Sequence, residues 1–182
     1  KKIRFGLLAI KNVGGEITRS IIEERVRGGP FKNFEEFLMR VQHKDLNKKS
    51  LESLIKTGVF DSLQIERNLA LQNLDEILKF TSAVRKSPLP NGKNGSLFGD
   101  KTVGVYLKLK PTRPATDEEK LTWEKELLGF YLSDHPLSAY APKIKEAKAS
   151  TIEELRSVKD GRTVRTAGVI SKIQKIFTKN GQ

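Results

Sequence analysis

The stretch Leu8-Ala9-Ile10-Lys11-Asn12-Val13-Gly14-Gly15-Glu16-Ile17 decides how the first half of the chain folds. Apolar residues lead into a short run with two glycines, and Thr18–Arg25 then has the composition of a helix. Because glycine lets a chain turn sharply, we expect two helical segments joined by a tight bend at Gly14. The second segment would begin with free backbone N–H groups at the positive end of a helix dipole, which suits a phosphate.

This stretch resembles a helix-hairpin-helix, in which a hairpin of the form glycine-hydrophobic-glycine joins two helices. Asn12 stands in place of the first glycine, and asparagine tolerates a positive φ better than most residues. Such motifs bind the DNA backbone without reading bases, so the contact should be independent of sequence and sensitive to salt. The DNA-binding residues predicted here are Lys11, Asn12, Val13, Gly14 and Gly15. The alternative is a glycine turn that only joins two packed helices.

A second, degenerate copy of the motif follows over Asp45–Ile55 and Thr57–Asp61. Paired hairpins are a common arrangement for gripping a duplex. Lys48 and Lys49 lie near a predicted helix start, and we predict that they add phosphate contacts. The alternative is that both lysines are solvated surface residues.

The first predicted domain, residues 1–85, has apolar residues at helical spacing and should be a cluster of short helices. Asn33 is predicted to cap a helix, since a carboxylate follows three positions later. Gly58 follows an apolar run at the position where a left-handed helix end is usually needed. Leucines and isoleucines over Asp61–Lys79 form one broad stripe, which predicts a single longer helix.

The composition changes over residues 86–115, where prolines and glycines interrupt any helix and indicate a linker. A helical connector is predicted over residues 116–158, because Thr116–Glu119 and Ser150–Glu153 each have the pattern of a capping box.

β-Branched residues replace the helical pattern over residues 159–182 and predict two strands. The hairpin signal Asn180-Gly181-Gln182 has no returning strand after it, so these would be the first strands of a sheet left incomplete. The predicted fold class is therefore mainly α with a small β part. Lys1-Lys2-Ile3-Arg4-Phe5-Gly6 has neither an initiator Met nor a signal-peptide core, and we expect a chain entered midway.

The composition favours a polyanionic partner. The 182 residues include 34 Lys and Arg against 22 Asp and Glu, which gives a net charge of +12. The favoured partner is nucleic acid, and the second candidate is an anionic membrane surface. A soluble protein whose charges are only solvated would have the same composition. The chain has no cysteine, which excludes disulfides and zinc ribbons and fits a reducing cytoplasm. No run reaches the about 20 apolar residues of a membrane helix. Nucleic acid is the partner that we expect, and no membrane.

Three stretches together resemble the alpha subunits of bacterial DNA polymerase III, which are replicative polymerases of the C family. Gly6–Leu63 is similar to their tandem helix-hairpin-helix region, Glu124–Leu137 to the segment before their OB domain, and Gly161–Ile170 to the first strand of that OB fold. The three stretches occur in the family's order. The resemblance implies a tandem helix-hairpin-helix domain, a linker, a helical connector and, over residues 159–182, an incomplete OB-fold domain.

The resemblance also implies a role for the linker. Asn94-Gly95-Ser96-Leu97-Phe98 is similar to the short peptide by which the family binds its sliding clamp, with Asn94 where Gln is usual. In such a peptide the amide hydrogen-bonds at a pocket rim while the two apolar side chains fill the pocket. The implied clamp-binding residues are Asn94, Ser96, Leu97 and Phe98.

The function implied by the resemblance is positional. We find no defensible catalytic or metal-binding set in the sequence, and the resemblance puts the acidic palm and its Mg²⁺ in another part of a DNA-directed DNA polymerase. This chain would hold duplex DNA and tether the enzyme to the clamp, the beta subunit, in the cytoplasm. Other replicase subunits and, through the complete OB domain, single-stranded DNA are further expected partners. The alternatives are a stand-alone helix-hairpin-helix DNA-binding or repair accessory protein, and a nuclease or ligase fragment with the same motif.

Overall fold

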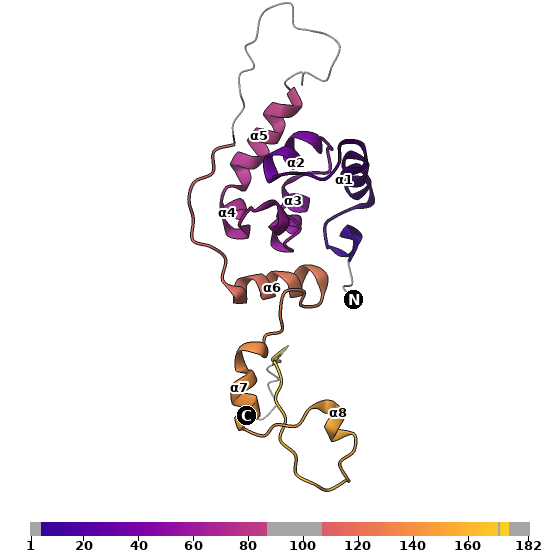
Figure 1. The fold of residues 1–182 in the computed structure, drawn as a ribbon, viewed down its shortest axis with the longest axis vertical. Coiled ribbons are helices and arrows are strands. Elements are labelled where there is room, and N and C mark those ends of the chain that lie inside the picture. The colour runs from indigo at the N-terminus through magenta and orange to yellow at the C-terminus, as the bar shows by residue number, and fades with distance from the viewer. Residues whose placement is uncertain (1–4, 87–106, 171, 175–182) are drawn as a thin grey trace, which may run out of the picture. The chain divides into compact units, whose positions relative to one another are not determined.

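The computed structural model of the chain describes residues 5–86, 107–170 and 172–174 (Figure 1). The chain forms two compact units, Lys1–Tyr131 and Leu132–Gln182. Within the described ranges the regular structure consists of α-helices and short 3-10 turns, without a β-strand. None of the helices described is long and apolar enough to cross a membrane.

The first unit is built from helices that Figure 1 shows gathered into one bundle, with α6 lying along one side of the others. Its α-helices are α1 (Gly15–Gly28), α2 (Phe34–Arg40), α3 (Lys48–Lys56), α4 (Arg67–Gln72), α5 (Leu74–Lys86) and α6 (Asp117–Leu128). Two 3-10 turns, η1 (Leu7–Ala9) and η2 (Asp61–Leu63), precede α1 and α4.

Side-chain caps set where several of these helices begin. Asn33 accepts a hydrogen bond of 2.8 Å from the N–H of Glu36 at the start of α2. Thr116 and Glu119 form a capping box at the start of α6. Both predicted helix starts are confirmed, and a cap of this kind stabilises a helix by about 1 kcal/mol.

The core of the first unit is formed by the inner faces of its helices. Leu38, Leu51, Leu54 and Ile77 have no exposed area. The rings of Phe37 and Phe60 pack edge to face beside them, with centroids 4.7 Å apart. Full burial of one such side chain contributes roughly 1.5–3 kcal/mol, so this core holds the helices together.

The single helix predicted over Asp61–Lys79 is wrong, because η2, α4 and α5 occupy that stretch. Gln64 adopts a left-handed φ of +58° after η2. Asn73 separates α4 from α5, and its side chain binds the backbone of Lys110 through two hydrogen bonds of 3.0 and 2.7 Å. Leu74 and Ile77 of the apolar stripe are buried and its other members are partly exposed, while contacts with a distant segment divide the helix.

That distant segment is an extended strap, residues 107–115, which polar side chains hold against the helices. Asn68 donates to the carbonyl of Arg113 at 2.8 Å. The carboxylate of Glu66 accepts from the N–H of Ala115 at 2.8 Å. The strap corresponds to the last residues of the predicted linker, 107–115, and these residues pack on the first unit.

Arg67 is the buried polar centre of the first unit. Its guanidinium donates to Glu124 at 3.1 Å, to Asp61 at 2.7 Å and to the carbonyl of Lys56 at 3.2 Å. Arg67 is 7 % exposed and Glu124 has no exposed area. One side chain therefore joins the end of α3, η2, α4 and α6.

Gly58 ends α3 in a conformation that this cluster requires. Its φ is +74°, which confirms the predicted left-handed glycine. A Cβ at this position would lie 2.2 Å from Nη2 of Arg67 and 2.7 Å from the Asp61 carboxylate. The guanidinium is held by three acceptors, so it cannot move aside freely.

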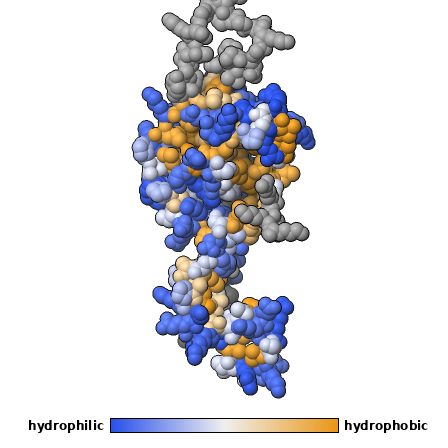
Figure 2. All heavy atoms as spheres, in the orientation of Figure 1, coloured by the Kyte–Doolittle hydropathy of each residue, from blue (hydrophilic) through white to orange (hydrophobic). Residues whose placement is uncertain are grey.

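The second unit contains η3 (Ser138–Tyr140), α7 (Ala141–Glu146) and α8 (Ile152–Leu155). The capping box of α8 is formed by Thr151 and Glu154. It lies one residue later than the sequence pattern predicted. Figure 2 shows a mostly hydrophilic surface over this unit.

The predicted OB-fold strands over residues 159–182 are wrong, since the described part of this stretch contains no strand. Arg165 accepts a backbone hydrogen bond of 2.8 Å from Ser150, but no ladder follows. Ile170 and Ile173 are each 76 % exposed. β-Branched residues favour extended backbone, yet a strand forms only beside a pairing neighbour. The small β part of the predicted fold class is therefore incorrect, while the helical part agrees with the structure.

We predict that Gly58→Ala destabilises the chain more than Gly129→Ala. Both glycines have positive φ, +74° and +85°, so both substitutions carry a conformational cost of about 1–2 kcal/mol. A Cβ at Gly129 meets nothing within 4 Å, whereas at Gly58 it collides with Arg67. Urea unfolding should show an additional loss of roughly 1–3 kcal/mol for Gly58→Ala. Equal losses would mean that the Arg67 cluster is not rigid.

Glu119 connects the strap to α6 and gives a pH-dependent contact. It accepts hydrogen bonds of 2.6 and 2.9 Å from Arg113 and one of 2.8 Å from the N–H of Thr116. The hydrogen bond from Arg113, helped by that from Thr116, lowers the pKa of Glu119 from 4.5 to about 2. The stabilisation is therefore complete above pH 4.5 and is lost as the pH falls toward 2.

We predict that the melting temperatures of the wild type and Glu119→Gln differ most above pH 4.5 and converge as the pH approaches 2. Thermal unfolding at a series of pH values measures this difference. Glu118→Gln is the matched control, because Glu118 makes no ion pair within the described residues. A difference for Glu119→Gln that stays constant with pH would contradict the assigned contact.

Candidate nucleic-acid interface

The bend between η1 and α1 has the backbone geometry of a hairpin. Asn12 adopts φ +68°, the left-handed conformation that the first glycine of the motif would take. Val13 is 6 % exposed, so its side chain belongs to the core, and its N–H donates to the carbonyl of Ile10 at 3.2 Å. Gly14 is the N-cap of α1, with extended φ and ψ of −85° and 173°.

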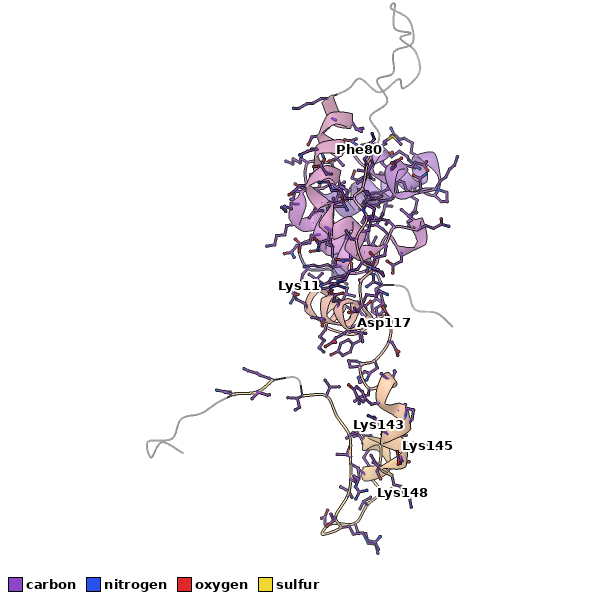
Figure 3. The ribbon with its side chains drawn as sticks, turned by 90° about the vertical axis from the view of Figure 1, so that its left-hand side faces the viewer. Lys11, Phe80, Asp117, Lys143, Lys145 and Lys148 are labelled. Atoms are coloured by element: carbon purple, nitrogen blue, oxygen red, sulfur yellow. The ribbon has the colours of Figure 1, made fainter. Side chains whose placement is uncertain are left out.

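Two further contacts fix this bend to its neighbours. The side-chain amide of Asn12 donates to Oγ of Ser53 on α3 at 3.0 Å. The backbone N–H of Lys11 donates to the carbonyl of Leu127 on α6 at 3.0 Å, and Figure 3 shows Lys11 beside α6. The bend is therefore held by the core, by α3 and by α6.

The start of α1 leaves its amides open. Gly14 and Gly15 are exposed, and nothing lies within 4 Å of the Cβ position of either. Thr18 donates to the carbonyl of Gly14, but the N–H groups of residues 14–17 have no acceptor among the residues that the structure describes. These N–H groups and the helix dipole together form the electrostatic arrangement that favours an anion.

The charges around the bend are compatible with an anion. Lys11 is exposed. Glu16, in the first turn of α1, would repel a phosphate, but its carboxylate forms an ion pair of 3.0 Å with Arg19. Arg19, which sequence reasoning missed, neutralises the acidic residue in the first turn of α1. The sequence feature that could have identified Arg19 is its position as a cation one turn into the predicted helix.

Lys48 and Lys49 have different surroundings. Lys48 pairs with Asp75 on α5 at 2.9 Å, and this hydrogen bond raises the pKa of Lys48. Lys49 lies four residues before Ser53 and therefore on the face of α3 that contacts Asn12. Lys49 therefore lies on the face of α3 nearest the bend, while Lys48 forms an ion pair with α5.

The start of α4, the helix that follows the second copy of the motif, is already bound by side chains of the chain itself. Glu66 caps α4 and accepts from the N–H groups of Leu69 at 2.7 Å and Ala115 at 2.8 Å. Burial alone would raise the pKa of Glu66, but these backbone hydrogen bonds outweigh it and lower the pKa. A carboxylate therefore lies where a phosphate would have to bind, and this hairpin holds the strap.

The described residues contain no group of three or more His, Asp or Glu side chains that could hold a metal ion. The predicted clamp-binding residues Asn94, Ser96, Leu97 and Phe98 lie outside the described residues.

Comparison with known proteins finds one motif family and a set of related chains. Residues 1–70 match the family described as "Helix-hairpin-helix motif". Three similar relatives are DNA polymerase III alpha subunits. That of Borreliella burgdorferi is 36 % identical over 97 % of this chain, that of Treponema pallidum 33 % over 99 %, and that of Thermus aquaticus 35 % over 100 %. The chain covers 16, 15 and 15 % of their respective lengths.

Proposed function

Because the chain is homologous along nearly its whole length to one segment of DNA polymerase III alpha subunits, we propose that it is the DNA-holding segment of a replicative DNA-directed DNA polymerase. The observation that carries this proposal is the open start of α1, where the N–H groups of residues 14–17 have no partner in the described part of the chain. The helix-hairpin-helix match over residues 1–70 includes this bend.

The proposed contact is between the backbone amides of the bend and a phosphate of duplex DNA. Gly14 and Gly15 have no side chain, so a phosphate can approach the amides closely. Lys11 adds a positive charge beside them. Amide groups and a lysine contact phosphates without reading base edges, so binding should depend on salt and not on sequence.

Polymerisation itself would need acidic residues that hold divalent metal ions beside a nucleotide. We assign these carboxylates and their Mg²⁺ to another part of a longer chain. On this proposal the segment positions the duplex in the cytoplasm, together with other replicase subunits, while nucleotide transfer takes place elsewhere.

We also propose that Asn94–Phe98 tethers the polymerase to its sliding clamp. The support is the similarity of this pentapeptide to the family's clamp-binding peptide. Its place in the chain adds to this support, because it lies between α5, which ends at Lys86, and residues 107–115 of the strap. Both flanks are thus anchored on the first unit.

Duplex binding tests the bend. We predict that Gly14→Val with Lys11→Ala weakens binding to duplex DNA about tenfold at moderate salt, because hydrogen bonds to a charged group are lost. The slope of log K against log salt should fall by about 1, for the lysine removed. Fluorescence anisotropy of a labelled duplex across a salt series measures both.

Two matched variants control for this result. Gly168→Val adds the same side chain at another open glycine, and Lys44→Ala removes another exposed lysine. Valine at residue 14 fits the extended backbone and meets no neighbour, so the fold should survive. If the bend variant binds like the controls, the bend is not the DNA contact.

Clamp binding tests the pentapeptide separately. We predict that Leu97→Ala with Phe98→Ala abolishes binding to the sliding clamp, because the two apolar anchors are removed. Asn94→Gln restores the family's usual residue and should strengthen binding. Surface plasmon resonance with an immobilised clamp measures these affinities, and Val103→Ala with Val105→Ala is the control for lost apolar surface. An unchanged affinity after the loss of Leu97 and Phe98 would remove the assignment.

A further inference from the structure

A cavity of about 440 Å³ lies between α3, α4, the start of α5, the strap and α6 of the first unit. Lys48, Glu52 and Lys56 line one wall at successive turns of α3. Leu71 supplies apolar lining, and Trp123 comes from α6. Residues 5–19, which include the Gly14 bend, contribute nothing to this lining. The cavity is therefore a separate feature of the unit.

The charges that line this cavity balance one another. Three cations meet three carboxylates in ion pairs, Lys48–Asp75 at 2.9 Å, Lys56–Glu52 at 2.6 Å and Arg113–Glu119 at 2.6 Å. A phosphate entering here would meet only cations that are already neutralised. The lining suits an uncharged group that carries both hydrogen-bond donors and acceptors.

Trp123 supplies an unused aromatic surface to the cavity. It is the chain's only tryptophan and is partly exposed. Among the described residues its ring makes no aromatic contact and its indole N–H no hydrogen bond. Gln72, also on the lining, is exposed, and within the described residues its side-chain amide makes one hydrogen bond, a long one of 3.4 Å to Asn68. A ring and an amide therefore both remain available to a ligand.

We propose that this cavity binds one unpaired base of a nucleic acid, stacked on Trp123 with its edge toward Gln72. A base has a flat face that stacks on aromatic side chains, and donors and acceptors along its edge that an amide can pair. The volume lies in the range of roughly 300–1,000 Å³ typical of small-ligand sites. A base within a duplex is stacked and paired, so only an unpaired base can enter. The net charge of +12 brings the polyanionic strand to the surface.

This inference goes beyond the duplex contact, because it assigns a base-binding site to residues that the Gly14 bend does not use. The bend recognises a phosphate with backbone amides. The cavity recognises a neutral heterocycle with a side-chain ring and an amide.

Tryptophan emission gives a direct test, since all of it comes from Trp123. The full 182-residue chain is titrated with a ten-nucleotide deoxyadenosine oligonucleotide, and in parallel with an abasic oligonucleotide of the same length and charge. We expect saturable quenching by the first and little change with the second, because only bases stack. Equal quenching by both, or quenching by neither, overturns the proposal.

Variants locate the base by anisotropy of the labelled deoxyadenosine oligonucleotide. Trp123→Ala should weaken binding about tenfold and Trp123→Phe much less, since phenylalanine keeps a stacking face. Gln72→Ala, at an exposed position, should weaken it about threefold through the lost hydrogen bond. Tyr140→Ala removes an exposed aromatic residue of the second unit and should change little. If Trp123→Ala does not fold, the quenching of the wild type and the affinity of Gln72→Ala test the proposed site instead. The proposed stacking on Trp123 beside Gln72 would be wrong if Gln72→Ala bound the oligonucleotide as tightly as the wild type and Trp123→Phe bound it as weakly as Trp123→Ala.

The same variants separate this site from the duplex contact. Gly14→Val with Lys11→Ala should retain the quenching by single strands, and Trp123→Ala should retain duplex binding. If the bend variant lost duplex binding but single strands did not quench the wild type, the base site alone would be wrong. If single strands quenched the wild type but the bend variant bound duplex DNA normally, the DNA contact at the bend alone would be wrong.

Discussion

The buried ion pair between Arg67 and Glu124 constrains the rest of the first unit. Glu124 has no exposed area, and removing one partner of such a pair typically costs about 3–5 kcal/mol, because the other charge stays buried. The pair fixes α6 against α4 and the end of α3. The carbonyl of Leu127 on α6 in turn accepts from the N–H of Lys11, so the same constraint helps to position the Gly14 bend.

The two hairpins of this unit have taken different roles from a similar sequence pattern. At the first, the amides of residues 14–17 are left without partners among the described residues. At the second, Glu66 occupies the amide of Leu69 and binds the strap through Ala115. At the second helix start, one capping residue therefore supplies an acceptor from the chain itself. The proposed DNA contact therefore rests on the first hairpin.

The proposed bend and the proposed base site would recognise different parts of a nucleic acid. The bend offers donors and a positive charge, which suit the anionic backbone. The Trp123 cavity has paired charges and a free ring, which suit a neutral base. Both sites depend on α6, which carries Trp123 and accepts from Lys11 through Leu127. Placing α6 correctly is therefore a condition for either kind of binding.

The sequence alone determined the features that arise within a few residues along the chain. The caps at Asn33 and Thr116 and the left-handed Gly58 follow from local backbone preferences and contacts between near neighbours. Asn12 favours the bend by its residue type, but contacts with the distant Ser53 and Leu127 also hold the bend. The DNA contact at the bend and the clamp-binding peptide both stay predictions.

Only the tertiary structure decided the features whose partners are far apart in sequence. Asn73 divides the expected long helix because Lys110 binds it from 37 residues away, and Glu124 reaches Arg67 across 57 residues. Lys48 faces Asp75 and not the bend for the same reason. The expected strands are absent from the described residues because β-branched composition cannot supply a pairing neighbour. Local patterns fix backbone conformation, whereas pairing, burial and charge neutralisation depend on which distant segments meet.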